Sequence, residues 1–188
     1  LSQMERLYLY QLTNYNKILI QRNNLLKQIR FQNNLIETLE AWDIQLVKYG
    51  SEVIKYREKF IKHLGEVCQK IHNKLTGGKE KILLEYDRDV GYDSYLTELA
   101  KKRQKDLKYS TTTVGPHRDD ISFIVNGIDI RKYGSQGQQR TAALSLKLAQ
   151  IQLMREVMKE SPILLLDDVL SELDSNRKTY LLESIKDT

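Results

Sequence analysis

The sequence predicts an α/β fold, which for these residues taken alone amounts to an α+β arrangement of an antiparallel helical hairpin and a partial sheet. Three observations predict it. Residues 1–74 contain no Pro and place apolar side chains at steps of three and four, as amphipathic helices do. Asn126 and Gly127 separate two apolar stretches, which is a hairpin signal. Residues 163–166 are continuously apolar, as a buried parallel strand is.

The first predicted domain, residues 1–75, is a helical hairpin of coiled-coil type. Its two helices are joined around residues 37–43, and each is on the order of 45–55 Å long at 1.5 Å per residue. The heptad seam of the first helix has polar interruptions. The seam positions are Leu12, Tyr15, Leu19, Arg22, Leu26, Ile29, Asn33 and Ile36, then Leu46, Tyr49, Val53, Tyr56, Phe60, Leu64, Val67 and Ile71.

The second predicted domain, residues 76–188, combines strands and helices. The segment Thr76-Gly77-Gly78-Lys79 breaks the helical pattern. It is not a phosphate loop, because the first Gly is missing and Glu80 stands where Ser or Thr would bind magnesium. The expected elements are strands at 82–86, 121–125, 128–130 and 163–166 and helices at 95–107, 138–158 and 176–185.

Composition limits the class of protein. Of the 188 residues, 40% are hydrophobic and 29% are charged, as in a globular chain. The apolar runs are too short to cross a membrane. A single cysteine, Cys68, excludes an internal disulfide framework and favours a reducing, cytoplasmic compartment. The start at Leu1 and the abrupt end at Thr188 lead us to expect a piece of a longer protein.

The positive charge lies in the first domain. The formal net charge is +5, and residues 1–74, with 12 Lys and Arg against 7 Asp and Glu, carry all of it. Lys17, Arg22, Lys27 and Arg30 define a basic face that either follows DNA phosphates or is simply solvated. On charge alone, the solvated face is the better interpretation.

Two short motifs carry the chemistry. Residues 134–138, Gly-Ser-Gln-Gly-Gln, open a predicted helix, where free amides and the helix dipole suit a phosphate. Ser135 either caps this helix or also offers its hydroxyl to a phosphate. Asp167 and Asp168 follow the apolar run directly, so they are expected at the carboxyl end of a strand, where one binds Mg²⁺ and the other acts as a base. Simple loop capping is disfavoured, since unpaired buried charge is costly.

The sequence His117-Arg118-Asp119 fits neither a kinase catalytic loop nor a metal site. The residue five positions after Asp119 is not Asn, and His63 and His72 are expected on the surface of the distant hairpin. Arg118 either pairs with a carboxylate or binds a phosphate. The sequence leaves both alternatives open.

Residues 115–120, 133–141 and 164–174, in this order and spacing, resemble the RecF family of bacterial DNA repair proteins, and the resemblance covers essentially the whole chain. RecF proteins are ABC-type ATPases related to SMC proteins, so the second domain is expected to be part of such an ATPase head. The resemblance implies that Asp167 is the Walker B ligand of Mg²⁺, Asp168 the catalytic carboxylate and Asp174 a D-loop residue. It also implies a signature motif that contacts the ATP of a second subunit, made of Ser135, Gln136, Gly137, Gln138 and Gln139.

The resemblance further implies an ATP-dependent homodimer that binds gapped or junction DNA. Such a protein hydrolyses ATP slowly with DNA stimulation and helps RecR and RecO to load RecA, in DNA replication, repair and the SOS response near the nucleoid. These residues contain no Walker A loop, so the chain alone is expected not to hydrolyse ATP. The alternatives are another ABC-type head, of a transporter or an SMC protein, and a non-enzymatic interaction module. The helical hairpin argues against the transporter and its modest length against the SMC protein.

Overall fold

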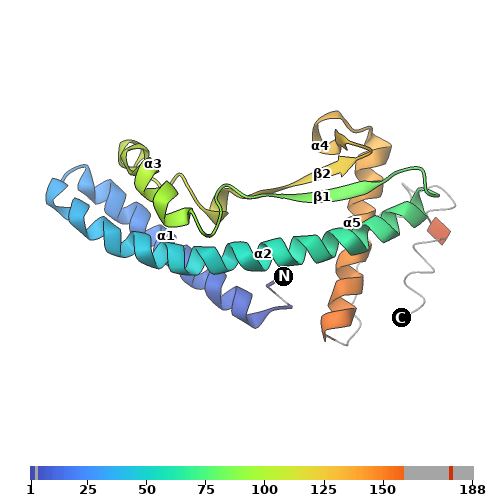
Figure 1. The fold of residues 1–188 in the computed structure, drawn as a ribbon, viewed down its shortest axis with the longest axis horizontal. Helices are drawn as coiled ribbons and strands as arrows, with labels where there is room; N and C mark the ends of the chain where they lie inside the picture. Colours follow the sequence, from blue (N-terminus) through green and yellow to red (C-terminus); the bar gives the residue numbers. More distant parts are fainter. Residues whose placement is uncertain (3, 159–177, 180–188) are drawn as a thin grey trace. The chain divides into compact units, whose positions relative to one another are not determined.

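The computed structural model describes residues 1–2, 4–158 and 178–179 (Figure 1). Its helices and strands follow the predicted order, and none of the described helices is long and apolar enough to span a membrane. The predicted strand at 163–166 lies outside the described residues. The elements are α1 (Arg6–Ile29), η1 (Asn33–Thr38), α2 (Leu39–Leu75), β1 (Ile82–Asp87), α3 (Tyr95–Tyr109), η2 (Pro116–Arg118), β2 (Asp120–Val125), β3 (Ile128–Asp129), α4 (Ile130–Tyr133) and α5 (Gln136–Met158).

The helices α1 and α2 form the predicted hairpin, with the short 3₁₀ helix η1 between them (Figure 1). At 1.5 Å per residue, α1 is about 36 Å long and α2 about 56 Å. The two helices of the hairpin therefore differ more in length than the sequence predicted. Helix α2 already begins at Leu39, inside the segment where the turn was expected. The short helix η1 supplies the change of direction that no Gly or Pro signals.

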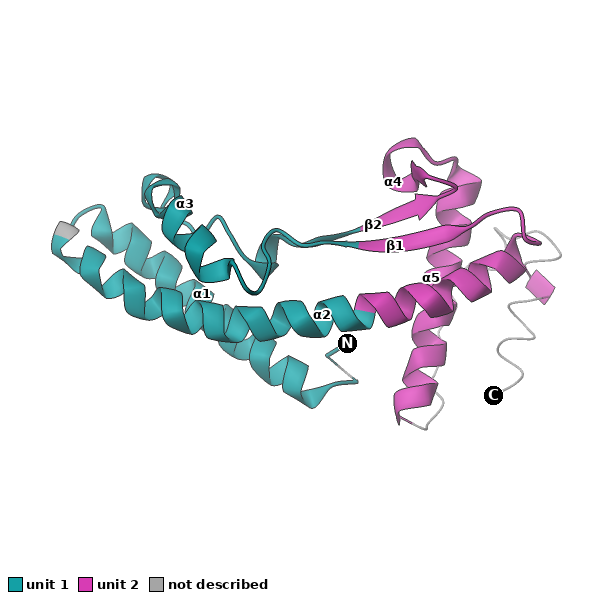
Figure 2. Cartoon of the chain, viewed as in Figure 1, with its two compact units in different colours: residues 1–60, 86–121 teal, residues 61–85, 122–188 magenta. Residues whose placement is uncertain are grey.

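The chain forms two compact units (Figure 2). Unit 1 comprises residues 1–60 and 86–121, and unit 2 comprises residues 61–85 and 122–188. This division does not follow the predicted boundary after residue 75. The reason is that residues 86–121 pack with the first two helices, and that the last part of α2 packs with later segments.

Unit 1 is built around tyrosines and aliphatic side chains from segments far apart in the sequence. Tyr15 of α1 is 1% exposed and Tyr95 of α3 is fully buried. Their hydroxyl oxygens lie 3.3 Å apart, which attaches α3 to the hairpin. The buried residues of this core are Tyr8, Tyr15, Leu46, Val53, Ile54, Val90, Tyr95, Leu99 and Val114.

Unit 2 combines the end of α2, the sheet and α5. The sheet has the order β1-β2-β3, and β2 pairs antiparallel with β3 in the register Ile124 to Asp129 and Val125 to Ile128. Asn126 and Gly127 take φ values of 50° and 83°, as a tight hairpin turn requires. The hairpin predicted from this dipeptide is thus confirmed. Helix α5 buries one stripe, which includes Leu144, Leu148 and Leu153.

Candidate functional site

Residues 135–138 form a capping box at the beginning of α5. The Ser135 hydroxyl oxygen accepts a hydrogen bond from the Gln138 amide at 3.3 Å, and the Gln138 side-chain oxygen accepts one from the Ser135 amide at 3.1 Å. This reciprocal pair fixes the first turn of a helix. The expectation that Ser135 caps the helix is confirmed.

The first turn of α5 is accessible from outside. Ser135, Gln136, Gly137 and Gln139 are exposed, and Gln138 is half-buried. A Cβ atom placed on Gly137 would meet only the Ser135 hydroxyl oxygen, at 3.9 Å. In the described part of the chain, the amides of Gln136 and Gly137 have no hydrogen-bond acceptor. The positive end of this helix dipole is therefore open to an anion such as a phosphate.

A chain of polar contacts inside unit 2 holds Gln138 in place. The Gln138 side-chain nitrogen donates to Glu80 at 3.1 Å, and the second oxygen of Glu80 lies 3.3 Å from Nε2 of His72. His72 Nδ1 lies 2.9 Å from the hydroxyl oxygen of Ser145, which in turn donates to the carbonyl of Thr141 on α5. This chain joins α5 at two turns to the end of α2. It gives Gln138 the outer support that a preorganised binding motif needs.

His72 is the one predicted surface histidine that the structure places differently. It is fully buried, whereas the side chain of His63 is 56% exposed. The prediction of a surface position was therefore wrong for His72. Its Nδ1 has a partner in the Ser145 hydroxyl, and its Nε2 lies 3.3 Å from the Glu80 carboxylate, two neighbours that the local sequence of α2 does not reveal.

Within residues 115–120, Asp119 fastens the segment that follows α3. Its carboxylate accepts hydrogen bonds from Arg57 Nη1 at 3.2 Å, from the Asp89 amide at 2.9 Å and from the hydroxyl of Tyr86. Arg57 Nη1 also donates to the carbonyl of Pro116 at 2.5 Å. Asp119 and Arg57 therefore fix the backbone of this motif from α2.

Gly115 and His117 lock the same segment against two buried tyrosines. Gly115 has a φ of 134°, and a Cβ atom on it would lie 2.2 Å from the Tyr95 hydroxyl oxygen, so only Gly fits. His117 Nε2 donates to the carbonyl of Thr112 at 3.1 Å, and Nδ1 lies 2.6 Å from the Tyr15 hydroxyl. Burial lowers the pKa of His117 and so favours the neutral ring. In that ring Nδ1 accepts a hydrogen bond from the Tyr15 hydroxyl.

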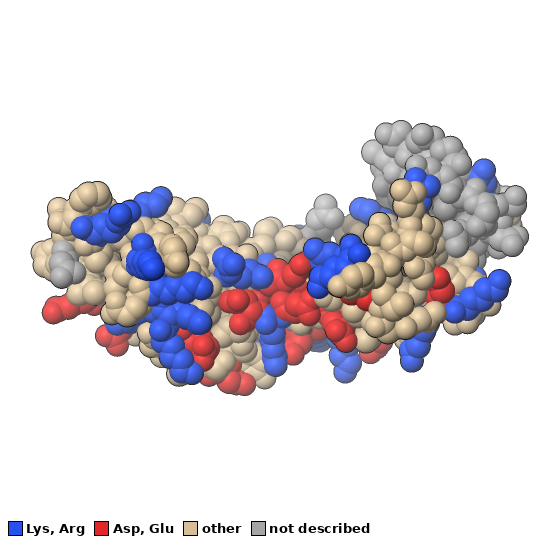
Figure 3. All heavy atoms as spheres, turned by 90° about the horizontal axis from the view of Figure 1, so that it is seen from above, with Lys and Arg blue, Asp and Glu red and all other residues tan. Residues whose placement is uncertain are grey.

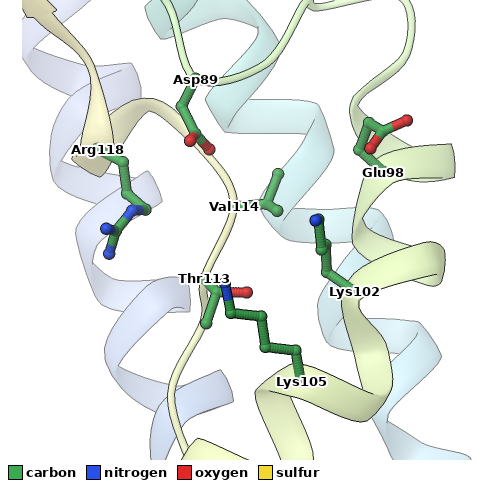
Figure 4. A pocket seen from close by; sticks show the side chains of 7 residues that line it. All are labelled: Asp89, Glu98, Lys102, Lys105, Thr113, Val114 and Arg118. Atoms are coloured by element: carbon green, nitrogen blue, oxygen red, sulfur yellow. The ribbon is translucent and has the colours of Figure 1, made fainter.

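Arg118 is one of the residues that line an open cleft of 480 Å³ (Figure 4). It is exposed and makes no ion pair with any described residue. Lys102 and Lys105 of α3 line the same cleft. Of the two alternatives that the sequence left open for Arg118, pairing with a carboxylate does not occur among the described residues.

Known proteins match the whole chain at high identity. No family model matches it. The DNA replication and repair protein RecF of Agathobacter rectalis is 54% identical over 188 residues, which are 100% of this chain and 52% of that protein. The RecF protein of Lachnoclostridium phytofermentans is 55% identical over 185 residues, 98% of this chain and 51% of that protein. This chain belongs to the RecF family. It spans about half the length of the curated RecF proteins it matches.

Solved RecF structures share the fold. One of the recombination mediator protein RecF with ATP in the RecFOR pathway superposes with a TM-score of 0.90 at 39% identity, covering 97% of this chain and 51% of that one. A second, of RecF with ATPγS, has a TM-score of 0.88 at 38% identity. The described architecture is therefore that of part of the RecF fold.

The predicted RecF site residues divide into two groups. Ser135, Gln136, Gly137, Gln138 and Gln139 lie together on the first turn of α5. Asp167, Asp168 and Asp174, the predicted magnesium, catalytic and D-loop residues, lie outside the described residues. Within the described ranges, no three His, Cys, Asp or Glu side chains are placed to hold a metal ion.

Three of the four residues predicted to form the basic face are exposed, and one is not. Lys17, Lys27 and Arg30 are exposed on or just after α1, but Arg22 is fully buried and cannot touch DNA in this fold. The assignment of Arg22 to that face is therefore wrong. The physical reason is that its guanidinium forms ion pairs with two buried carboxylates of the same unit.

Arg22 is the centre of a buried polar cluster that sequence reasoning missed. Its Nε donates to Asp43 Oδ1 at 2.6 Å, and its Nη1 donates to Asp106 Oδ2 at 2.7 Å and to the Thr112 hydroxyl at 2.8 Å. Arg103 donates to the second oxygen of Asp43 at 2.8 Å. The cluster connects α1, α2 and α3. The signal in the sequence was Arg22 at a seam position, because an Arg buried there is stable only with a carboxylate partner.

Proposed function

We propose that this chain is the arm and signature segment of a DNA repair ATPase that closes as a homodimer around ATP. The observation that carries this proposal is the exposed first turn of α5. There residues 135–139 present an open helix N-terminus that is held by the capping box and by the hydrogen bond from Gln138 to Glu80. In a symmetric dimer, this surface of one subunit faces the nucleotide held by the other. The similarity to RecF structures with ATP and ATPγS supports the choice of nucleotide.

We assign the remaining nucleotide contacts to residues outside the described part of the chain. Asp167 would hold Mg²⁺, Asp168 would orient the attacking water and Asp174 would belong to the D-loop, as the family resemblance implies. Mg²⁺ and ATP together supply the phosphoryl-transfer chemistry. The role of residues 135–139 is to bind γ-phosphate oxygens through helix amides and the Ser135 hydroxyl, so that binding of ATP favours the closed dimer.

The substrate of this protein is proposed to be DNA with gaps or junctions. Lys17, Lys27 and Arg30 are exposed cations on the arm that fit contacts to the DNA backbone. RecR, RecO and RecA are proposed as partners on the family resemblance, and the related RecF-ATP structure, which belongs to the RecFOR pathway, supports this choice.

Cysteine cross-linking of a full-length family protein that carries this segment tests the proposal. With Ser135 replaced by Cys and a second Cys placed beside the Walker A loop that the family resemblance implies, ATP and a short bifunctional thiol reagent are expected to yield a covalent dimer, because closure brings each α5 to the partner's nucleotide. Cys68 is a suitable silent thiol, since it is fully buried and burial raises its pKa to about 12.

The matched control places the new thiol elsewhere on the same helix, at Ala143, which is exposed two turns beyond Ser135. Little ATP-dependent dimer is expected from this variant. Cross-linking at Ser135 that is equal with and without ATP would contradict the proposal and favour a non-enzymatic interaction module.

A further inference from the structure

The cleft beside α3 is a second charged surface of unit 1, separate from the signature motif (Figure 4). It lies between the exposed side of α3 and the segment from Thr113 to Arg118, which ends in η2. Its volume is 480 Å³. The lining residues are Asp89, Glu98, Lys102, Lys105, Thr113, Val114 and Arg118.

Both carboxylates of the cleft are already engaged. Glu98 forms an ion pair with Lys101 at 2.7 Å, and Asp89 accepts a hydrogen bond from the Gly115 amide at 2.9 Å. Lys102, Lys105 and Arg118 make no ion pair with any described residue. The cleft therefore presents three cations that form no ion pair with its two carboxylates.

The walls that carry these cations are firmly attached. Thr113 donates twice to Asp106, from its amide at 2.9 Å and from its hydroxyl at 2.6 Å. Asp106, which lies on α3, also binds the buried Arg22, and Arg103 of the same helix binds Asp43. The cluster around Arg22 thus fixes both sides of the cleft. A rigid scaffold lowers the entropy cost of binding a ligand there.

The surrounding surface is also basic. Helix α3 carries Lys101, Lys102, Lys105 and Lys108 as exposed residues, while its second acid, Asp106, is fully buried and directed inward. Figure 3 shows Lys and Arg side chains gathered on the left of the view, where Figure 1 places α3. Cations that extend along a helix beyond the cleft match a row of backbone phosphates better than a single small anion.

We propose that this cleft binds two or more successive backbone phosphates of duplex DNA, with Arg118 as the bidentate donor and Lys102 and Lys105 as point charges. The Arg fork matches phosphate geometry, and lysines three positions apart share one face of a helix. This inference rests on the proposed DNA-repair function. It places a principal contact on α3 and the segment before β2, rather than on the basic face of α1 alone.

Neutralising the three cations tests the assignment in a full-length family protein. The triple variant Lys102→Gln, Lys105→Gln, Arg118→Gln is compared with the wild type for binding of a fluorescent gapped duplex over a range of salt concentrations. The slope of log K against log salt is expected to fall by about 3, at about 0.9 per phosphate contact. Affinity near 0.1 M salt should fall about 10-fold or more.

The matched control is Lys59→Gln, Lys62→Gln, Lys70→Gln, which removes the same charge from exposed positions of α2. Its affinity and slope should stay within twofold of the wild type. Equal losses in both triple variants, or unchanged binding by the cleft variant, would overturn the inference while DNA binding by the wild type still supports the proposed function. Absence of DNA binding by the wild type would instead count against the function itself.

Titration with inorganic phosphate and with ATP addresses the other possible ligand. Inorganic phosphate at 1 mM is expected to give no binding heat that depends on the cleft cations, and ATP is expected to give the same heat with the wild type and the cleft variant, because its proposed site does not include the cleft. Saturable binding of either anion that disappears in the cleft variant, together with unchanged DNA binding, would replace the inference with a small-anion site.

Discussion

Replacing Asp106 by Ala is expected to lower the free energy of unfolding of unit 1 by about 3–5 kcal/mol. Asp106 is fully buried and receives the Arg22 guanidinium at 2.7 Å and two hydrogen bonds from Thr113. Its removal leaves part of a buried positive charge without a partner. Urea unfolding followed by the fluorescence of Trp42, the single Trp of the chain, measures the loss.

The exposed acid Glu37 provides the control, because Glu37→Ala removes a carboxylate that has no partner among the described residues and should change stability by less than about 0.5 kcal/mol. The double variant Arg22→Met, Asp106→Leu should lose less than the sum of the two single changes, since neither charge is then left alone. Additive losses, or a cost for Asp106→Ala no larger than that of the control, would contradict the assigned role of the cluster.

Replacing Gly137 by Leu is expected to abolish ATP-driven association of a full-length family protein and to lower ATP hydrolysis about 100-fold or more, the scale seen when a preorganised donor is lost. The side chain fits the folded chain, because a Cβ atom at Gly137 meets nothing closer than 3.9 Å. It would instead fill the space that a partner's phosphate must enter. Light scattering with and without ATP, and phosphate release, measure the two effects.

Ala143→Leu serves as the matched control, because it adds an exposed apolar side chain on α5 away from the first turn. It should retain both association and hydrolysis. A Gly137→Leu protein that unfolds at the same urea concentration as the wild type, yet still dimerises with ATP, would show that this turn does not face a nucleotide.

The elements that local sequence encodes were predictable. The periodicity of apolar residues located the helices now described as α1, α2 and α5, and a charged stretch indicated α3. The Asn126-Gly127 dipeptide located the β2–β3 turn. These patterns extend over only a few residues, so they can be recognised in a single sequence without knowledge of tertiary contacts. The capping box at Ser135 was predictable for the same reason.

The packing of distant segments was not predictable in this way. Arg22 and Asp106 lie 84 positions apart, and nothing near either residue indicates that they meet. The same holds for His72 and Ser145, which are 73 positions apart. The units therefore divide the chain differently from the boundary near residue 75. The burial of His72, which was expected on the surface, and of Arg22, which was expected both on the seam and on the basic face, has the same origin.

Mixing two defective proteins tests the central claim that residues 135–139 serve the nucleotide of another subunit. One full-length protein carries Gly137→Leu, and the other lacks the lysine of the Walker A loop that the family resemblance implies. Each alone should be inactive. Equal mixing should restore between about a quarter and about a half of the wild-type ATP hydrolysis, because only a mixed dimer holds an intact site and it holds one of two. The lower value applies if the subunits pair at random, and the higher value applies if only mixed dimers form. Activity of the mixture no higher than that of the separate proteins would contradict the claim.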